Sequence, residues 1–194
     1  MNIGLYFGSF NPVHIGHLII ASHVANNSDL NQVWLVVSPH NPLKHSNSLL
    51  NEYHRLHLIQ SSLEGEKNLK VSNIEFNLPK PSYTIDTLAY LKEKYPAYEF
   101  SIIIGSDGFQ NLDNWKNAEV IIANYPIIIY KRPGFDINTD LGAKIQIMKA
   151  PLLEISATYI RELIQRGKSI KHLVPSSVEE EISTYGFFKK IQKK

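Results

Sequence analysis

Short apolar runs alternate with helix-like stretches along almost the whole chain. Parallel strands must be joined by a crossover, usually a helix, so this alternation is typical of a parallel sheet. The expected strands are 3–7, 33–37, 71–76, 99–104, 127–130 and 145–148. The expected helices are about 16–25, 52–63, 84–95, 158–166 and 177–185. The order predicts an α/β fold with a Rossmann-like, doubly wound, mostly parallel sheet.

The length of 194 residues fits one domain, and no linker-like stretch or repeat divides the chain. We therefore expect a single domain over 1–194, with a small helical C-terminal part from about residue 156. The absence of cysteine excludes disulfides, thiolate metal sites and a cysteine nucleophile, and it fits a reducing compartment.

The net charge and the hydropathy of the chain limit the kinds of partner that we expect. The net charge of +2 is too weak to favour duplex nucleic acid. There is no signal-peptide pattern at Met1 and no apolar run long enough to span a membrane. We expect a cytoplasmic protein without nucleic-acid or membrane partners, while a homodimer stays open.

The loop after the first expected strand runs from Gly8 to His17 and leads directly into a helix. Gly8 allows a sharp turn and close approach to a ligand, and Gly16 clears space at the helix start. His14 and His17 are three residues apart and should point the same way from the first turn. Two imidazoles beside the positive end of a helix form a compact anion site, suited to a polyphosphate.

The two histidines have two other possible interpretations. A lone histidine on a loop is more often an ordinary surface residue. Two histidines at this spacing can also ligate zinc, but no cysteine or nearby acidic residue supports a zinc site. We therefore expect no protein-bound metal here.

The string His14-Ile15-Gly16-His17 resembles the His-x-Gly-His signature of a nucleotidyltransferase superfamily that transfers AMP or CMP from a nucleoside triphosphate. A second superfamily mark, a Ser/Thr motif opening a late helix, is similar to residues 155–161. The resemblance implies that His17 contacts the α-phosphate and that His14 and Arg161 contact the outer phosphates. Lys44, after the second expected strand, is a further candidate phosphate contact.

The implied reaction is attack of a substrate phosphate on the α-phosphorus of ATP. A phosphate monoester is mostly dianionic at neutral pH, so no general base is required. Catalysis then depends on alignment and on neutralising the charge that builds on the phosphates. Mg²⁺ is expected, carried by ATP and pyrophosphate.

Two more segments indicate the acceptor. Residues 81–88, which contain Ser82-Tyr83-Thr84-Ile85, resemble a segment of bacterial nicotinate-nucleotide adenylyltransferases. In that family a Gly-x-Asp after a strand contacts ribose and a nearby tryptophan stacks on the pyridine ring, which Gly105, Asp107 and Trp115 match. Residues 131–134 also look like the family's Arg-Pro-Gly segment.

The resemblance extends from residue 3 to about residue 187 and implies that ATP and nicotinate mononucleotide are the substrates. The residues expected to bind ATP are Gly8, Ser9, Phe10, Gly16, Gly105, Asp107, Arg132, Ile155, Ser156 and Thr158. The residues expected to bind the acceptor are Ser82, Tyr83, Thr84, Ile85, Trp115 and Lys116. Phe7, Asn11 and Leu43 depart from the family pattern, which affects details of substrate contact.

The alternatives fall into two classes. Within the same chemistry, nicotinamide mononucleotide or phosphopantetheine is the acceptor; in another class, the chain is a non-catalytic nucleotide-binding regulatory protein. A dehydrogenase is disfavoured because no Gly-x-Gly-x-x-Gly follows the first strand. Residues 167–169 resemble the end of a P-loop, but Glu162 stands where the leading glycine is needed.

Overall fold

The computed structural model describes residues 1–39, 49–137, 142–151 and 153–189. The strands are β1 (Asn2–Gly8), β2 (Gln32–Val37), β3 (Leu69–Ser72), β4 (Glu99–Gly105), β5 (Ile127–Tyr130) and β6 (Ile145–Met148). The α-helices are α1 (Ile15–Asn27), α2 (Glu52–Ser62), α3 (Thr84–Lys94), α4 (Ser106–Phe109), α5 (Ala118–Asn124), α6 (Ala157–Gln165) and α7 (Ser176–Tyr185). Two short 3₁₀ helices are η1 (Ile74–Asn77) and η2 (Leu112–Asn114).

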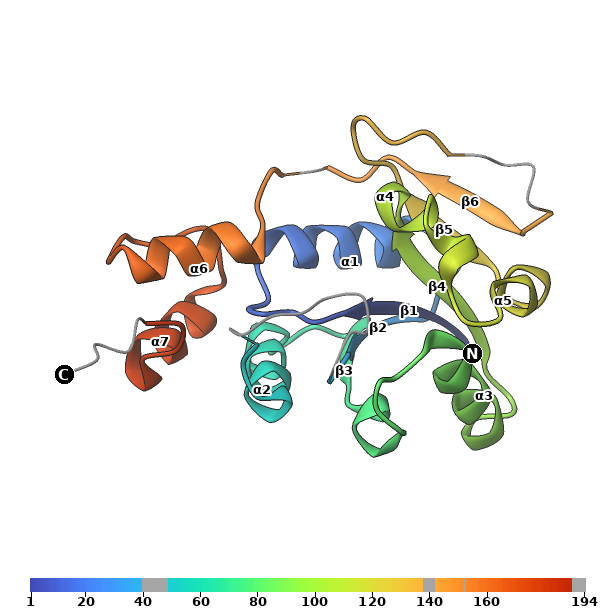
Figure 1. Cartoon of the computed structure of the whole chain (residues 1–194), viewed down its shortest axis with the longest axis horizontal. Helices are drawn as coiled ribbons and strands as arrows, with labels where there is room; N and C mark the ends of the chain where they lie inside the picture. Colours follow the sequence, from blue (N-terminus) through green and yellow to red (C-terminus); the bar gives the residue numbers. More distant parts are fainter. Residues whose placement is uncertain (40–48, 138–141, 152, 190–194) are drawn as a thin grey trace.

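The six strands form one sheet in the order β3-β2-β1-β4-β5-β6, and every neighbouring pair is parallel. The chain runs outward from β1 to β3 and then returns to build β4, β5 and β6 on the other side of β1 (Figure 1). The order reverses between β1 and β4, and ligands bind parallel sheets outside the carboxyl ends of the strands at this point. The predicted α/β, doubly wound fold is confirmed.

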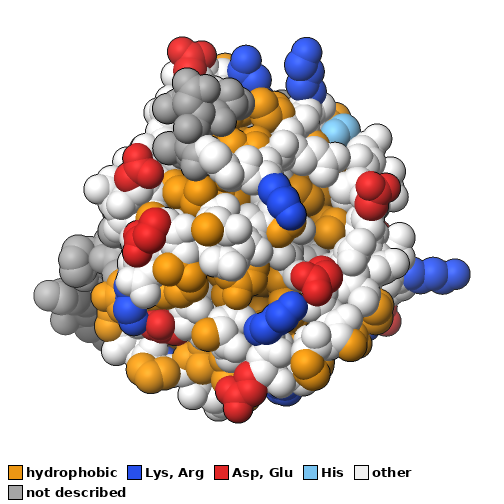
Figure 2. Space-filling model, turned by 90° about the vertical axis from the view of Figure 1, so that its right-hand side faces the viewer, with side chains coloured by type: hydrophobic (Ala, Val, Ile, Leu, Met, Phe, Trp, Pro, Cys, Tyr) orange, Lys and Arg blue, Asp and Glu red, His pale blue; other side chains and the backbone are white. Residues whose placement is uncertain are grey.

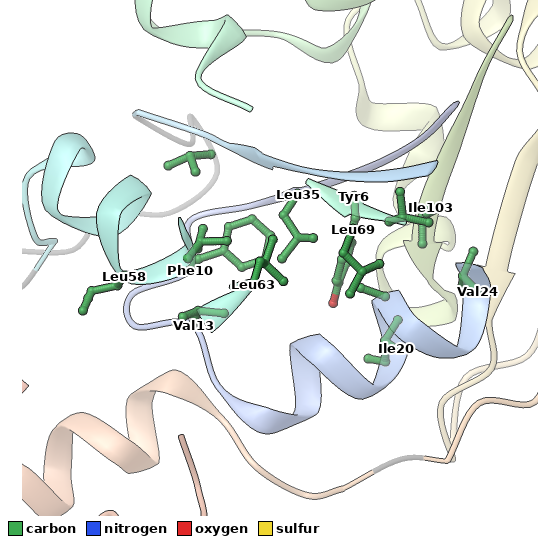
Figure 3. Packing of buried hydrophobic residues seen from close by; sticks show 14 of the residues in the cluster. Tyr6, Phe10, Val13, Ile20, Val24, Leu35, Leu58, Leu63, Leu69 and Ile103 are labelled. Carbon is green, nitrogen blue, oxygen red and sulfur yellow. The ribbon is translucent and has the colours of Figure 1, made fainter. Parts of the chain in front are cut away.

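Two apolar clusters cover the two faces of the sheet. The first contains Tyr6, Val24 of α1, Leu58 of α2 and Ile160 of α6, and Figure 3 shows part of it between β1 and α1. The second contains Ile3, Leu5 and Leu88 of α3 among its members. Alternate residues of β1 therefore point to opposite buried faces, as the two-residue period of a strand requires.

The expected strand over 71–76 is wrong beyond Ser72. The Ser72 Oγ accepts a hydrogen bond from the backbone N–H of Ile74 at 3.3 Å, and the chain turns there into η1. Glu75, within the expected strand, is instead buried and bonded to side chains near α3. No helix was expected over α4 or α5. Both helices are short, and polar residues lie in or beside them.

The surface seen from the right of Figure 1 carries Lys and Arg side chains interspersed with Asp and Glu (Figure 2). Neither sign gathers into a single patch on this face. No helix in the described ranges is long and apolar enough to cross a membrane.

Candidate active site

The loop between β1 and α1 is anchored in the core by its apolar side chains. Phe10 and Val13 are buried in the first cluster, where Figure 3 shows both beside the sheet. A Cβ at Gly8 would lie 2.8 Å from the Phe10 ring, so a larger residue there would displace the ring. Because the Phe10 side chain is buried, any contact of Phe10 with ATP would be made by its backbone.

The two signature histidines stack against each other. The ring centroids of His14 and His17 are 3.6 Å apart, with an interplanar angle of 25°. The backbone N–H of His14 donates to Nδ1 of His17 at 3.3 Å. A neutral imidazole whose Nδ1 accepts a hydrogen bond carries its proton on Nε2. The expectation that the two side chains point the same way is confirmed.

His14 is held in its neutral form. Only 6% of the residue is exposed, and burial together with the nearby Arg132 charge lowers its pKa to about 4. Within the described residues its Nδ1 has no hydrogen-bond partner, and a Cβ at Gly16 would lie 3.1 Å from this atom. Gly16 therefore leaves room for the imidazole, and a buried ring nitrogen remains to be satisfied.

Helix α6 brings an arginine from the last quarter of the chain to this loop. Ser156 is the N-cap, and its Oγ accepts from the backbone N–H of Tyr159 at 3.1 Å. Arg161 donates from Nη1 to the carbonyl of Asn11 at 2.7 Å and from Nη2 to Oγ1 of Thr158 at 3.1 Å. Ile155 packs against the first cluster. Burial lowers the pKa of Arg161.

At the ends of β4 and β5, two predicted ATP-binding residues contact each other. Arg132 Nη1 lies 3.3 Å from Oδ2 of Asp107, and Nη2 donates to the Tyr130 hydroxyl at 3.3 Å. The backbone N–H of Arg132 donates to Oγ of Ser106 at 2.9 Å. A Cβ at Gly105 would meet Oδ1 of Asp107 and lie 3.0 Å from the Tyr130 hydroxyl, so a larger residue at this strand end would displace these side chains.

The predicted acceptor-binding residues meet at the start of α3. Lys116 Nζ lies 2.9 Å from Oδ2 of Asp86 and 4.9 Å from the centroid of the Tyr83 ring. Tyr83 is the N-cap of α3, which begins at Thr84.

Trp115 is half-buried and, like Ile85, packs against the second cluster, so part of its indole is held by the core. Ser82 donates to the buried carboxylate of Glu75 at 2.7 Å.

Three further residues bear on the site, of which one was predicted from the sequence and two were not. Lys44 lies outside the described residues. Sequence reasoning missed Arg55 and Glu75, which are both buried. A signal for Arg55 existed, since it precedes Leu58 and Ile59 by three and four positions and therefore lies on the apolar face of α2. Among the described residues, no group of three or more His, Cys, Asp or Glu could hold a metal ion.

Comparisons with known proteins agree with this arrangement. The cytidylyltransferase-like family model matches residues 5–163. A protein of Flavobacterium psychrophilum named "Probable nicotinate-nucleotide adenylyltransferase" is 52% identical, and the match covers 98% of this chain and all of that protein. Its Flavobacterium johnsoniae counterpart of the same name is 49% identical, over 98% of this chain and all of that protein.

Solved structures share the fold at lower identity. The nicotinic acid mononucleotide adenylyltransferase of Plasmodium falciparum, solved in complex with NaAD, matches with a TM-score of 0.82 at 22% identity. The match covers 96% of this chain and 97% of that one. The fold, the paired histidines and the full-length relatives all agree, and the chain belongs to the nicotinate-nucleotide adenylyltransferase family of cytidylyltransferase-like proteins.

Proposed function

We propose that this protein transfers AMP from ATP to nicotinate mononucleotide, giving deamido-NAD and pyrophosphate. The observation that carries the proposal is the stacked pair of His14 and His17 at the start of α1, with Arg161 fixed to the same loop through the Asn11 carbonyl. The names of the Flavobacterium relatives and the NaAD bound by the Plasmodium enzyme support nicotinate mononucleotide as the acceptor.

The site supplies donors and positive charge in the places that this reaction needs. A phosphate oxygen of the acceptor forms a bond to the α-phosphorus, while the bond to the bridging oxygen breaks and its electrons leave with pyrophosphate. The Nε2–H of His17 would donate to the α-phosphate, and His14, Arg161 and Lys44 would contact the outer phosphates. Of the other ATP-binding candidates, Gly105, Asp107 and Arg132 lie at the ends of β4 and β5, where Asp107 would contact the ribose.

His14 changes its chemistry when the polyphosphate binds. Its pKa of about 4 keeps it neutral in the free protein. A triphosphate beside it favours the charged form and raises that pKa, because opposite charges at close range stabilise each other. A phosphate beside the charged ring would then be paired with a positive charge, which suits the site to a polyanion.

We expect Mg²⁺ to reach the site bound to ATP. The side chains gathered here are imidazoles and an arginine, which donate to phosphate oxygens and do not compete with them for a hard cation. The ion would be held mainly by the phosphates themselves, where it supplies charge neutralisation.

The acceptor would bind between the start of α3 and η2. Backbone N–H groups of Tyr83, Thr84 and Ile85 at the helix start suit the nicotinate carboxylate. The Trp115 indole suits the flat pyridine ring, and Lys116 adds positive charge beside Tyr83.

The test is pyrophosphate release with ATP and Mg²⁺ and, separately, nicotinate mononucleotide, nicotinamide mononucleotide or phosphopantetheine. We expect a clear preference for nicotinate mononucleotide and loss of activity in His17→Ala. Preference for phosphopantetheine would remove the roles of Tyr83 and Trp115. No turnover with any acceptor, together with tight ATP binding, would instead indicate a nucleotide-binding regulatory protein.

A further inference from the structure

Arg55 is a fully buried arginine whose donors go to backbone carbonyls. Nη1 donates to the carbonyls of Ser9 at 2.6 Å and Ser38 at 2.9 Å, and Nη2 donates to Pro39 at 3.1 Å. Nε donates to Leu50 at 2.8 Å. Burial lowers its pKa to about 10, so the guanidinium stays charged at neutral pH. One side chain therefore joins the loop after β1, the end of β2 and the residues before α2.

Glu75, in η1, is a second buried ionisable side chain. It is 2% exposed, and its carboxylate accepts from Oγ of Ser82 at 2.7 Å and from Oγ1 of Thr87 at 2.8 Å. The Ser38 side chain lies beside this carboxyl and, like Ser82 and Thr87, acts to lower its pKa. Burial raises the pKa of this carboxyl, and the hydrogen bonds oppose that change.

Ser38 connects the two charged groups. Its carbonyl accepts from Arg55, and its hydroxyl lies beside the Glu75 carboxyl, which Ser82 and Thr87 hold by hydrogen bonds. A continuous path therefore runs from Ser9 in the loop that carries the histidines, through Arg55, Ser38 and Glu75, to Ser82 beside the predicted acceptor site. Buried charges are costly unless hydrogen-bonded, and here both are satisfied by groups from the two loops that the reaction must align.

We infer that Arg55 and Glu75 are positioning residues that hold the ATP loop and the acceptor segment in register through Ser38, an inference that rests on the proposed function. In-line transfer requires the attacking phosphate and the α-phosphorus to be placed accurately, and misplacement of about 1 Å can cost on the order of 100-fold in rate. Arg55 fixes the backbone of the loop that ends at His14. Glu75 fixes the hydroxyls on either side of Tyr83 and Thr84.

The first variants remove single links. Glu75→Gln keeps the shape but replaces one accepting oxygen by an NH₂ group, so one hydroxyl loses its acceptor. We expect the KM for the acceptor to rise about tenfold while the KM for ATP changes less than about twofold. Ser38→Ala removes only the hydroxyl and leaves the carbonyl that Arg55 uses; its effect should be the same in kind and smaller.

A double-mutant cycle distinguishes positioning from a general loss of stability. Ser38→Ala and Glu75→Gln break the same link, so their effects on kcat/KM should combine to less than the product of the two single effects. The matched control is Leu91→Ala, which removes fully buried volume from the same helix, α3, away from this path. It should lower Tm, leave both KM values unchanged, and combine multiplicatively with Glu75→Gln.

Arg55→Lys tests the other end, because a lysine keeps the charge but cannot reach four carbonyls. We expect kcat to fall about 10- to 100-fold with a smaller change in the acceptor KM. An unchanged acceptor KM in Glu75→Gln, or a fully multiplicative cycle with Ser38→Ala, would overturn the inference.

The measurements distinguish an error in the proposed acceptor from an error in the positioning role of Arg55 and Glu75. The cycle is measured with whichever acceptor the wild-type protein prefers, so a different acceptor removes only the proposed substrate. If the wild-type protein turns over no acceptor, the cycle is measured on calorimetric binding of nicotinate mononucleotide in the presence of ATP. Multiplicative effects there would overturn the inference in the same way.

Discussion

The part of the site proposed to bind the phosphates and the part proposed to bind the acceptor are built in different ways. His14 is 6% exposed and stacks on His17 above a loop whose Phe10 is buried in the core. By contrast, the side chains of Asp86 and Lys116 are each 44% exposed and pair at the surface. The phosphate part is thus fixed by the core, while the exposed Asp86–Lys116 pair of the acceptor part can change without disturbing the fold. The residues proposed for the chemistry that the superfamily shares are thus separate from those proposed to select one substrate.

The largest expected effect is loss of His17 from the phosphate part. His17→Ala removes a donor to the α-phosphate, and loss of one such donor costs about 100- to 1000-fold in kcat. His23→Ala, later on the same helix, is the matched control and should keep wild-type activity. Steady-state pyrophosphate release measures both. If His17→Ala kept more than a tenth of the wild-type kcat, the phosphate part would not be the main source of catalysis.

The second prediction concerns the pH dependence of stability. His14 has a pKa of about 4 in the folded state against 6.5 as its ordinary value. Below pH 6.5 the unfolded chain binds a proton that the folded protein does not, so stability present above pH 6.5 is lost as the pH falls toward 4. The linked loss is about 3 kcal/mol at pH 4, from 1.36 kcal/mol per pKa unit. Urea unfolding between pH 7 and pH 4 measures it.

His14→Gln is the comparison variant, because glutamine does not titrate. Its free energy of unfolding should depend less on pH over the same range. Equal slopes for the two proteins would show that His14 is not held neutral by burial, and the contrast between the two parts of the site would weaken.

A third prediction tests the fixation of the loop by α6. Arg161→Lys keeps the charge but loses the fork that reaches both the Asn11 carbonyl and Thr158, so kcat/KM for ATP should fall about 10- to 100-fold. The matched control is Arg166→Lys, whose arginine pairs at the surface with Glu162. That variant should retain the wild-type value. Equal effects of the two changes would argue against a specific role for Arg161.

The smallest effect is expected in the acceptor part. Lys116→Met breaks an exposed ion pair with Asp86, and such pairs contribute about 0.2–1 kcal/mol to stability. We expect a Tm within about 3 °C of wild type, together with an acceptor KM several-fold higher and an unchanged KM for ATP. Lys92→Met, which breaks the exposed pair with Glu99, is the control and should change neither KM. A large fall in Tm for Lys116→Met would show that this part, too, is fixed by the core.

Much of the fold could be predicted because the periodic apolar runs belong to the buried strands. The prediction of a strand over 71–76 was wrong beyond Ser72 because the burial of Glu75 depends on hydrogen bonds from Ser82 and Thr87. Both residues lie outside the apolar pattern on which the prediction was based. The helix α5 was missed because only Ala118 and Ile121 of its seven residues are buried, too few to stand out as a periodic pattern.

The site was predictable where its residues are neighbours in the chain, as with the spacing of His14 and His17. It was not predictable where it depends on which strands are adjacent. The pairing of Asp107 with Arg132 follows from β4 lying beside β5, and no local pattern states that. Arg55 was missed because a charged residue on an apolar helix face is explained only by the carbonyls that three other segments bring to it.

The first turn of α1 is tied to the far end of the chain. The backbone N–H of Ile15 donates to the carbonyl of Leu173 at 3.0 Å, and Asn11 receives Arg161. During synthesis these two contacts can form only after Arg161 and Leu173 have been translated, well after the loop itself and the earlier residues that also anchor it. The growing polypeptide therefore has its histidines well before these two contacts form, and nucleotide binding should strengthen once α6 and Leu173 have been translated.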